Sequence, residues 1–253
     1  MLFDTGPFYF ICLIHPIMKN IEKIFTTPGG QFVTPIETLA EKLKHIRAFV
    51  FDWDGVFNDG TKNEHGSSTF SETDAMGTNL LRLSSWMATG KMPYCAVLSG
   101  EENRISFRYG AREHFHRVYY QVKDKTIALK HFEETFGLKN ENILFVFDDV
   151  LDLSLARICG VRMLISRKAN PMFRNYVVEN KLADYATAHD GSQFGVREVC
   201  ELFMALTGNY NEALENRITF SPEYSSYFKA RQEIPTSFYS VVNNEIVLRE
   251  ITV

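Results

Sequence analysis

The chain has 253 residues, of which 45% are hydrophobic, 23% charged and 13% aromatic, a composition typical of a folded protein with one large domain. This composition excludes a mainly disordered chain and a low-complexity fibre. The 27 basic and 31 acidic residues give a net charge of −4. Because no basic run appears either, a nucleic-acid partner is not expected.

The cysteines and the N-terminal segment together predict a cytoplasmic protein. Cys12, Cys95, Cys159 and Cys200 form no CxxC pair, so we expect reduced, mostly buried thiols rather than disulfides or a zinc site. The longest apolar run, Phe8–Ile14, is far shorter than the ~20 residues that cross a bilayer. No Lys or Arg precedes it, so neither a membrane span nor a secretory signal is predicted.

Short apolar strands alternate with helical patterns along most of the chain. A helix is predicted over 35–46 and a strand over 47–54. Further strands are predicted at 94–100, 114–120, 142–149, 161–166 and 183–188. The other predicted helices are 75–89, 101–110, 123–136, 150–159, 171–181 and 196–206. This alternation predicts an α/β fold, a Rossmann-like parallel sheet with helices on both faces.

Two segments interrupt this alternation. The stretch 59–73 is rich in Gly, Ser, Thr and Asn, and is predicted to form a β-hairpin insertion. After Gly208 the alternation stops, and an aromatic-rich tail follows that has a second hairpin predicted around Asn243-Asn244. The predicted organisation is an N-terminal extension over 1–43, a main domain over 44–208 and a C-terminal tail over 209–253.

Polar side chains follow four of the predicted strands at their carboxyl ends, which is where ligands bind in such sheets. Asp52 and Asp54 end the first strand, and residues two apart on a strand point to the same side. Ser99 and Gly100 follow the second strand at a helix N-terminus, which suits an anionic oxygen. The remaining sets are Lys123 and Lys125 after the third strand, and Asp148, Asp149 and Asp152 after the fourth.

The residue types at this edge of the sheet suit phosphoryl chemistry. Carboxylates from two strands can hold Mg²⁺, which prefers oxygen ligands and retains waters for a substrate phosphate. One carboxylate is then left to attack phosphorus, and its neighbour can transfer protons. A lysine and a hydroxyl can bind the charged oxygens of the transferring group.

In chain order, these residues resemble the four motifs of the haloacid dehalogenase (HAD) superfamily. The motifs are Asp52-Trp-Asp-Gly-Val, Ser99, Lys125 and Phe147-Asp-Asp-Val-Leu-Asp152. The closer resemblance is to its capless branch, the 3-deoxy-D-manno-octulosonate 8-phosphate (KDO 8-phosphate) phosphatases, and it covers residues 44–208. The further shared features are Asp52–Gly60, Phe70-x-x-x-Asp74, Tyr120-Gln121, Ala183–Thr187 and Gly195–Cys200.

The resemblance implies a Mg²⁺-dependent phosphomonoester hydrolase acting on a small phosphorylated sugar acid such as KDO 8-phosphate. Asp52 would form an aspartyl-phosphate, and Asp54 would be the general acid/base and give Mg²⁺ a backbone carbonyl. Retention of an acid at position 54 favours a phosphatase over a dehalogenase, because halide needs no proton to leave. The resemblance further implies that Ser99, Gly100 and Lys125 bind the phosphoryl group and that Asp148 binds the metal with Asp52 and Asp54. Asp149 and Asp152 would support the metal site or fix its loop. Arg104 would contact the substrate, and Arg197 the substrate or a subunit interface.

Two departures from the family pattern support alternatives. Glu101 stands where the family has Arg, which favours a phosphatase of different substrate range, although Arg104 lies one turn later and is a candidate replacement. Phe147 replaces a Gly, which favours a degenerate member that serves as a binding or assembly subunit. Retention of carboxylates that repel one another speaks against a scaffold. Lys123 in the place of Lys125, and a surface role for Arg197, also stay open.

The spacing of the motifs predicts a homo-oligomer, and the resemblance implies a homotetramer. Only 45 positions separate Asp54 from Ser99, and 23 separate Lys125 from Asp148, so neither interval holds a cap domain. Without a cap, the site would be open to water, and a neighbouring subunit would help to close it. The unpaired edges of the predicted hairpin over 59–73 favour pairing with that subunit.

Overall fold

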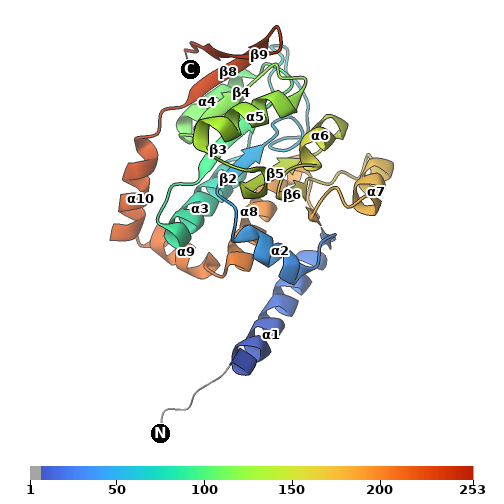
Figure 1. Ribbon diagram of the computed structural model, residues 1–253, viewed down its shortest axis with the longest axis vertical. Helices are drawn as coiled ribbons and strands as arrows, with labels where there is room; N and C mark the ends of the chain where they lie inside the picture. Colours follow the sequence, from blue (N-terminus) through green and yellow to red (C-terminus); the bar gives the residue numbers. More distant parts are fainter. Residues whose placement is uncertain (1–6, 253) are drawn as a thin grey trace.

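The computed structural model describes residues 7–252, with side chains described from residue 16 onward. One twisted sheet runs through it in the order β1-β7-β6-β5-β2-β3-β4-β8-β9 (Figure 1). All neighbours from β7 to β8 are parallel, and the outermost strands, β1 and β9, are antiparallel. The strands are β1 (Gln31–Phe32), β2 (Ala48–Phe51), β3 (Tyr94–Leu98), β4 (Arg117–Tyr119), β5 (Ile143–Phe147), β6 (Val161–Leu164), β7 (Tyr185–Ala186), β8 (Ser237–Val242) and β9 (Glu245–Arg249).

Helices cover both faces of this sheet, as the alternation of strands and helices predicts. Side chains of β2 alternate between the faces: Phe49 and Phe51 join a core with α2, α3 and α8, whereas Val50 joins a core with α5, α6 and α7. The helices are α1 (Pro7–Thr26), α2 (Ile36–Leu43), α3 (Glu72–Thr89), α4 (Arg104–Arg112), α5 (Lys125–Phe136), α6 (Leu153–Ala156), α7 (Pro171–Glu179), α8 (Gly195–Thr207), α9 (Tyr210–Ile218) and α10 (Pro222–Gln232). The predicted Rossmann-like α/β fold is confirmed.

The register of the central strands brings the predicted motifs together. Phe51 on β2 lies beside Val97 on β3 and Val146 on β5. The carboxyl ends of these three parallel strands therefore meet at one edge of the sheet, and the residues that follow them lie side by side. The interval between β2 and β3 holds only a loop and α3, so no cap domain lies there.

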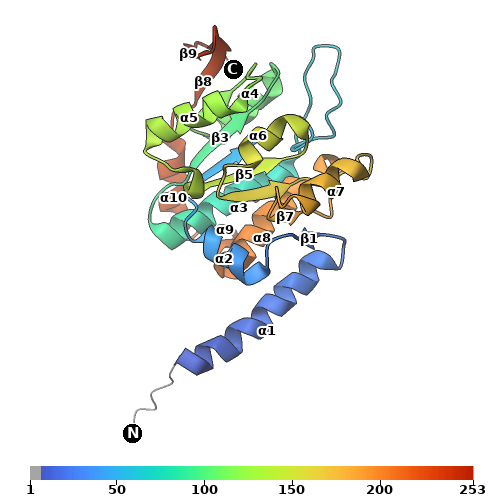
Figure 2. The same ribbon diagram turned by 45° about the vertical axis from the view of Figure 1, so that its right-hand side comes forward.

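The predicted β-hairpin insertion is not confirmed. Residues 59–71 form an extended loop, without strands, that stands away from the helices (Figure 2, light blue). A turn at its tip is held by Asn63, whose Oδ1 accepts hydrogen bonds from the His65 and Ser67 N–H groups. The Gly, Asp and Asn residues of the loop have low β propensity, and its exposed tip has no apolar face to pack, so a turn forms without a ladder.

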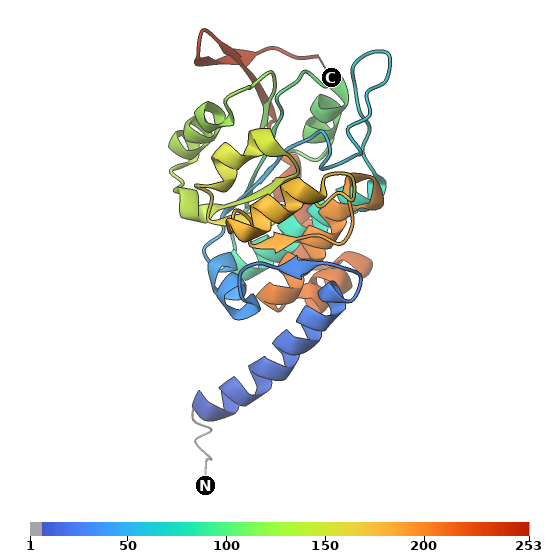
Figure 3. The same cartoon turned by 90° about the vertical axis from the view of Figure 1, so that its right-hand side faces the viewer.

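The segments at the two ends of the chain extend the sheet at opposite edges (Figure 3). β1 pairs with β7, and β8 pairs with β4. β8 and β9 form the second predicted hairpin, with Asn243 and Asn244 both at positive φ, the conformation that a tight two-residue turn requires. Tyr227 of the aromatic tail is buried and donates a hydrogen bond to the Asn79 carbonyl. The domain boundaries given above stay predictions.

The described cysteines match the expectation of free thiols. Cys95, Cys159 and Cys200 are unpaired and buried. The side chains of Cys12 and of the apolar run Phe8–Ile14 lie outside the described residues. None of the helices within residues 7–252 has the length and apolar character that a bilayer span requires.

Candidate active site

Asp52 directly follows β2, and its buried carboxylate faces the start of α5. Its Oδ1 accepts a hydrogen bond from Lys125 Nζ at 2.6 Å. Burial raises the pKa of Asp52 to about 6, although the positive charge of Lys125 opposes the rise. The carboxylate is therefore held in one orientation with little water around it, and these conditions suit a nucleophile.

Lys125 is the first residue of α5, which begins there because the Asp124 side chain accepts a hydrogen bond from Thr126 N–H. Its buried ammonium bridges Asp52 Oδ1 and Asp152 Oδ1. Burial alone would lower the pKa of Lys125, but attraction to these two carboxylates outweighs it and raises the pKa. Lys125 is therefore positively charged and contacts Oδ1 of Asp52, whereas Lys123 is exposed.

Asp148 directly follows β5 and offers the clearest position for a metal. Its Oδ1 is buried without a hydrogen-bond partner among the described residues, and its Oδ2 pairs with Arg167. Burial and the charge of Asp52 raise the pKa of Asp148 well above its usual range. Oxygens of Asp52, Asp148 and Asp152 all lie within 4.8 Å of one another, so these residues could hold a metal ion.

Asp152 differs from the other two carboxylates because both of its oxygens already have partners. Oδ1 contacts Lys125, and Oδ2 accepts hydrogen bonds from the N–H groups of Asp148 and Asp149 at 3.4 and 3.3 Å. Asp152 therefore fixes the loop after β5, as expected from the sequence. All three carboxylates are buried, but Asp148 fits a divalent cation better than Asp152, because one of its oxygens has no partner among the described residues.

Asp54 lies at the base of the protruding loop, with its carboxylate a fifth exposed. Lys62 Nζ contacts its Oδ2 at 2.5 Å, and Ser68 Oγ and Asn103 Nδ2 donate hydrogen bonds to its Oδ1. Asn103 also donates to Ser68 Oγ at 2.7 Å, which joins the two donors into one network. The Asp54 carboxylate is thus oriented by the loop and by the residue that caps α4.

Ser99 and Gly100 follow β3, on the side of Asp52 that is opposite to Asp148. Ser99 is buried, and its Oγ accepts a hydrogen bond from Glu101 N–H at 3.2 Å. Glu101 lines the pocket and forms an ion pair with Lys123. The negative charge at position 101 is therefore balanced by a neighbouring lysine, a pairing that the sequence does not reveal.

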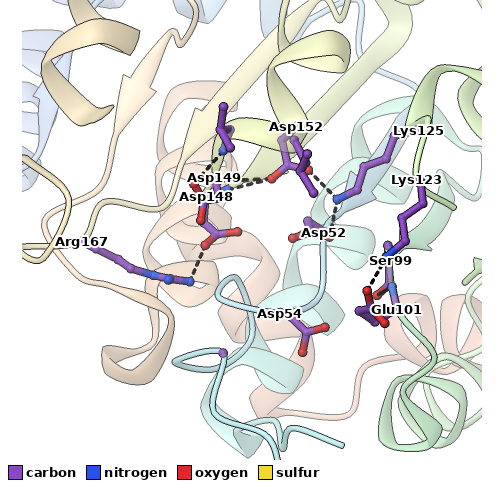
Figure 4. A pocket seen from close by; sticks show the side chains of 14 residues that line it. Asp52, Asp54, Ser99, Glu101, Lys123, Lys125, Asp148, Asp149, Asp152 and Arg167 are labelled. Carbon is purple, nitrogen blue, oxygen red and sulfur yellow. Dashed lines mark hydrogen bonds and ion pairs between the residues drawn. The ribbon is translucent and has the colours of Figure 1, made fainter. Parts of the chain in front are cut away.

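These side chains surround one pocket of about 350 Å³, a volume suited to a small metabolite (Figure 4). The pocket brings together six of the eight predicted site residues: Asp52, Asp54, Ser99, Gly100, Lys125 and Asp148.

The two predicted substrate arginines lie outside this pocket. Arg104 lines a neighbouring hollow with Glu250, near the end of the chain. Arg197 forms an ion pair with Glu201 on α8, and its backbone N–H donates to Asp74. Their roles in substrate binding stay predictions.

Two cations at the site, Lys62 and Arg167, were not among the predicted residues. Arg167 follows β6, so the rule that site residues follow strand ends, applied to a fifth strand, would have found it. Lys62 lies in the protruding loop, where nothing in the sequence pattern indicates a contact with Asp54. Phe147 points into the core and stacks on Phe145, so its side chain does not enter the pocket.

No protein-family model matches the sequence, but individual phosphatases are similar to it. The 3-deoxy-D-manno-octulosonate 8-phosphate phosphatase of Salmonella typhi is 26% identical over 184 residues, which cover 71% of this chain and 90% of that protein. The phosphatase of the same name from Escherichia coli K12 is 26% identical over 176 residues, covering 68% of this chain and 86% of the relative.

Solved structures share the fold. A probable YrbI family phosphatase from Pseudomonas syringae is 28% identical, with a TM-score of 0.60, and covers 71% of this chain and 97% of its own. A phosphatase from Moraxella catarrhalis, in complex with magnesium, phosphate and KDO, is 23% identical, with a TM-score of 0.59 over 74% of this chain and all of its own. In sequence and in fold, this chain is similar to the HAD superfamily phosphatases of the KDO 8-phosphate branch, which confirms the resemblance indicated by its motifs.

Proposed function

We propose that this protein is a Mg²⁺-dependent phosphomonoester hydrolase that forms an aspartyl-phosphate on Asp52. The observation that carries this proposal is a single pocket lined by Asp52, Asp54, Lys125 and Asp148, in which one buried oxygen of Asp148 has no partner among the described residues. The similarity to KDO 8-phosphate phosphatases supports a small phosphorylated sugar acid as the substrate.

The roles of the side chains follow from their positions. Asp52 attacks phosphorus and displaces the alkoxide, while Asp54 donates the proton that the alkoxide needs to leave. Asp54 then accepts a proton from the water that hydrolyses the aspartyl-phosphate. Lys125 and Ser99, which follow β4 and β3 on the same side of Asp52, bind the phosphoryl oxygens. A Mg²⁺ ion held by Asp52 and Asp148, with the Asp54 carbonyl, would neutralise the charge of the transferring group.

A phosphatase of different substrate range remains the second candidate, because Glu101 lines the pocket. The Glu101 carboxylate alone would repel an anionic group of the substrate. Its ion pair with Lys123 balances this negative charge. We therefore keep a sugar acid as the first candidate. A degenerate scaffold is not favoured, since the catalytic set is assembled.

We also propose that the protein acts in the cytoplasm as a homotetramer. The protruding loop carries the Lys62 contact to Asp54, so a neighbouring subunit packed on this loop would both order Asp54 and exclude water. Sedimentation should show an assembly well above the 29.1 kDa monomer, and deletion of residues 63–68 should lower both its mass and its activity. A fully active monomer at micromolar concentration would contradict this part of the proposal.

The direct test of the activity is hydrolysis of a chromogenic aryl phosphate with and without Mg²⁺. Activity should disappear on chelation, and Asp52→Asn should lower kcat by about 10⁴-fold while leaving the fold intact, because an amide is a poor nucleophile. A screen of phosphorylated metabolites that includes KDO 8-phosphate then identifies the substrate. Substantial Mg²⁺-dependent activity in pure Asp52→Asn protein would overturn the assignment.

A further inference from the structure

Arg167 occupies a position that the proposed mechanism does not use. It follows β6, its side chain is a quarter exposed, and its guanidinium reaches across the pocket to Asp148 Oδ2 (Figure 4). Space for this contact exists because residue 55 is glycine at φ +88°. A Cβ at Gly55 would lie 1.6 Å from Arg167 Nη2 and 2.1 Å from Asp148 Oδ2.

The contact places Arg167 in competition with a divalent cation. Asp148 is the carboxylate that best fits the metal, and one of its two oxygens is bound by the guanidinium. A cation at Asp148 also repels a positive charge held at hydrogen-bond distance from the same carboxylate. Entry of the metal and retention of the Arg167 pair therefore oppose each other.

The other positive charges that line the pocket have partners that the metal would leave in place. Lys123 pairs with Glu101. Lys125 would keep Asp152, because that carboxylate fixes the loop and is not the preferred ligand. Among the described residues of the pocket lining, Arg167 alone depends on a side chain that the metal would take over.

We propose that Arg167 is a counter-ion of Asp148 that a divalent cation displaces, and that the displaced guanidinium then binds an anionic oxygen of the substrate. The anion-binding part rests on the proposed function. Arg167 lies where its side chain can turn into the pocket, and a guanidinium binds phosphate or carboxylate oxygens through two parallel N–H donors. Metal and anion would thus bind cooperatively through one side chain.

Titration calorimetry without turnover tests both parts. Arg167→Gln removes the charge, and Lys168→Gln removes the same charge from the exposed neighbour as a matched control. We expect Arg167→Gln to bind Mg²⁺ about tenfold more tightly than the wild type, because the competing charge-assisted hydrogen bond is gone. The control should bind Mg²⁺ like the wild type. Equal Mg²⁺ affinity of the wild type and Arg167→Gln would overturn the proposal that Arg167 is a displaceable counter-ion of Asp148.

Inorganic phosphate is the probe for the anion. At saturating Mg²⁺, Arg167→Gln should bind phosphate about tenfold more weakly than the wild type, and Arg167→Lys should lie between them. Without Mg²⁺, the wild type and Arg167→Gln should bind phosphate equally, because Asp148 holds the guanidinium. An effect of equal size with and without Mg²⁺, or no effect in either, would overturn the metal-linked anion site. Failure to hydrolyse any phosphate ester would reject the proposed function alone, since these affinities require no turnover.

Discussion

Asp184 and Asp148 are both buried aspartates beside the same sheet, but their surroundings differ in kind. Asp184 precedes β7 and accepts hydrogen bonds from Thr34, Lys42 and Arg162, and Arg162 donates to both of its oxygens. Burial alone would raise the pKa of Asp184, but these donors outweigh it and lower the pKa. At Asp148, one oxygen has no partner among the described residues, and the pKa is raised.

The difference separates a carboxylate that supports the fold from one that is free to bind a ligand. A saturated buried charge ties elements together, here α2 to the segment between β6 and β7. An unsaturated one makes the fold less stable and persists where its spare oxygen serves a function. Substitution of a saturated carboxylate should therefore change stability, and substitution of an unsaturated one should change ligand binding.

The largest effect on stability is expected at Asp184. Asp184→Asn leaves two partly buried cations, Lys42 and Arg162, without their buried charged partner and should lower the free energy of unfolding by about 3 kcal/mol. Because the folded-state pKa of Asp184 is lowered, its contribution is present above the ordinary value of 3.8 and is lost as the pH falls through the folded-state pKa. Denaturant unfolding of the wild type and of Asp184→Asn at pH 7 and pH 3 measures the loss of stability and its dependence on pH. Equal loss at the two pH values, or none, would contradict the comparison.

Asp148→Asn should show the reverse pattern. We expect Mg²⁺ affinity to fall at least about a hundredfold, with little loss of stability, because the amide is a poor metal ligand and removes a costly buried charge. Asp149→Asn, a change at the exposed neighbour, is the control. If Asp148→Asn keeps a wild-type metal titration and Asp149→Asn does not, the fourth motif is shifted by one residue.

Asp74 on α3 lies between these extremes and predicts a pH dependence of the opposite sign to that of Asp184. Its Oδ1 accepts the Arg197 N–H at 2.9 Å, its Oδ2 has no partner among the described residues, and burial raises its pKa to about 7. Its contribution to stability is present below pH 3.8 and is lost as the pH rises through about 7. Asp74→Asn should therefore gain about 2–3 kcal/mol on the wild type between pH 5 and pH 8. If the free energies of unfolding of the wild type and of Asp74→Asn change in parallel between pH 5 and pH 8, Asp74 does not titrate in this range.

The smallest effect is expected at the rim of the pocket. Glu101→Arg should raise kcat/KM for KDO 8-phosphate, relative to a neutral sugar phosphate, by about tenfold, because it replaces a negative charge and frees Lys123. Glu102→Arg, at an exposed position outside the pocket lining, controls for a general change of charge. An unchanged ratio for Glu101→Arg would mean that position 101 does not face the substrate.

The sequence predicts those parts of the fold and the site that depend on local pattern. Buried strands such as β5 are continuous apolar runs, and Asp52, Ser99, Lys125 and Asp148 come together because the ends of parallel strands meet. The joining of β8 to β4 depends on packing between distant segments. Sequence spacing carries no information about such contacts.

The same limit explains which charges were missed. Asp54 meets Lys62, and Asp148 meets Arg167, across loops whose paths are set by the whole fold. The excess of carboxylates at the strand ends is visible in the sequence, but the cations that balance them are not.

The central claim, that Asp52 is a nucleophile, is tested most directly by trapping its phosphorylated form. Wild-type protein mixed with Mg²⁺ and the best phosphate ester from the screen is quenched in acid within one turnover, and its peptides are analysed by mass spectrometry. The account predicts one added phosphoryl group on the peptide that contains Asp52, absent without Mg²⁺ and absent in Asp52→Asn. A phosphoryl group on another residue, or full turnover without any phosphorylated peptide on this timescale, would contradict the account.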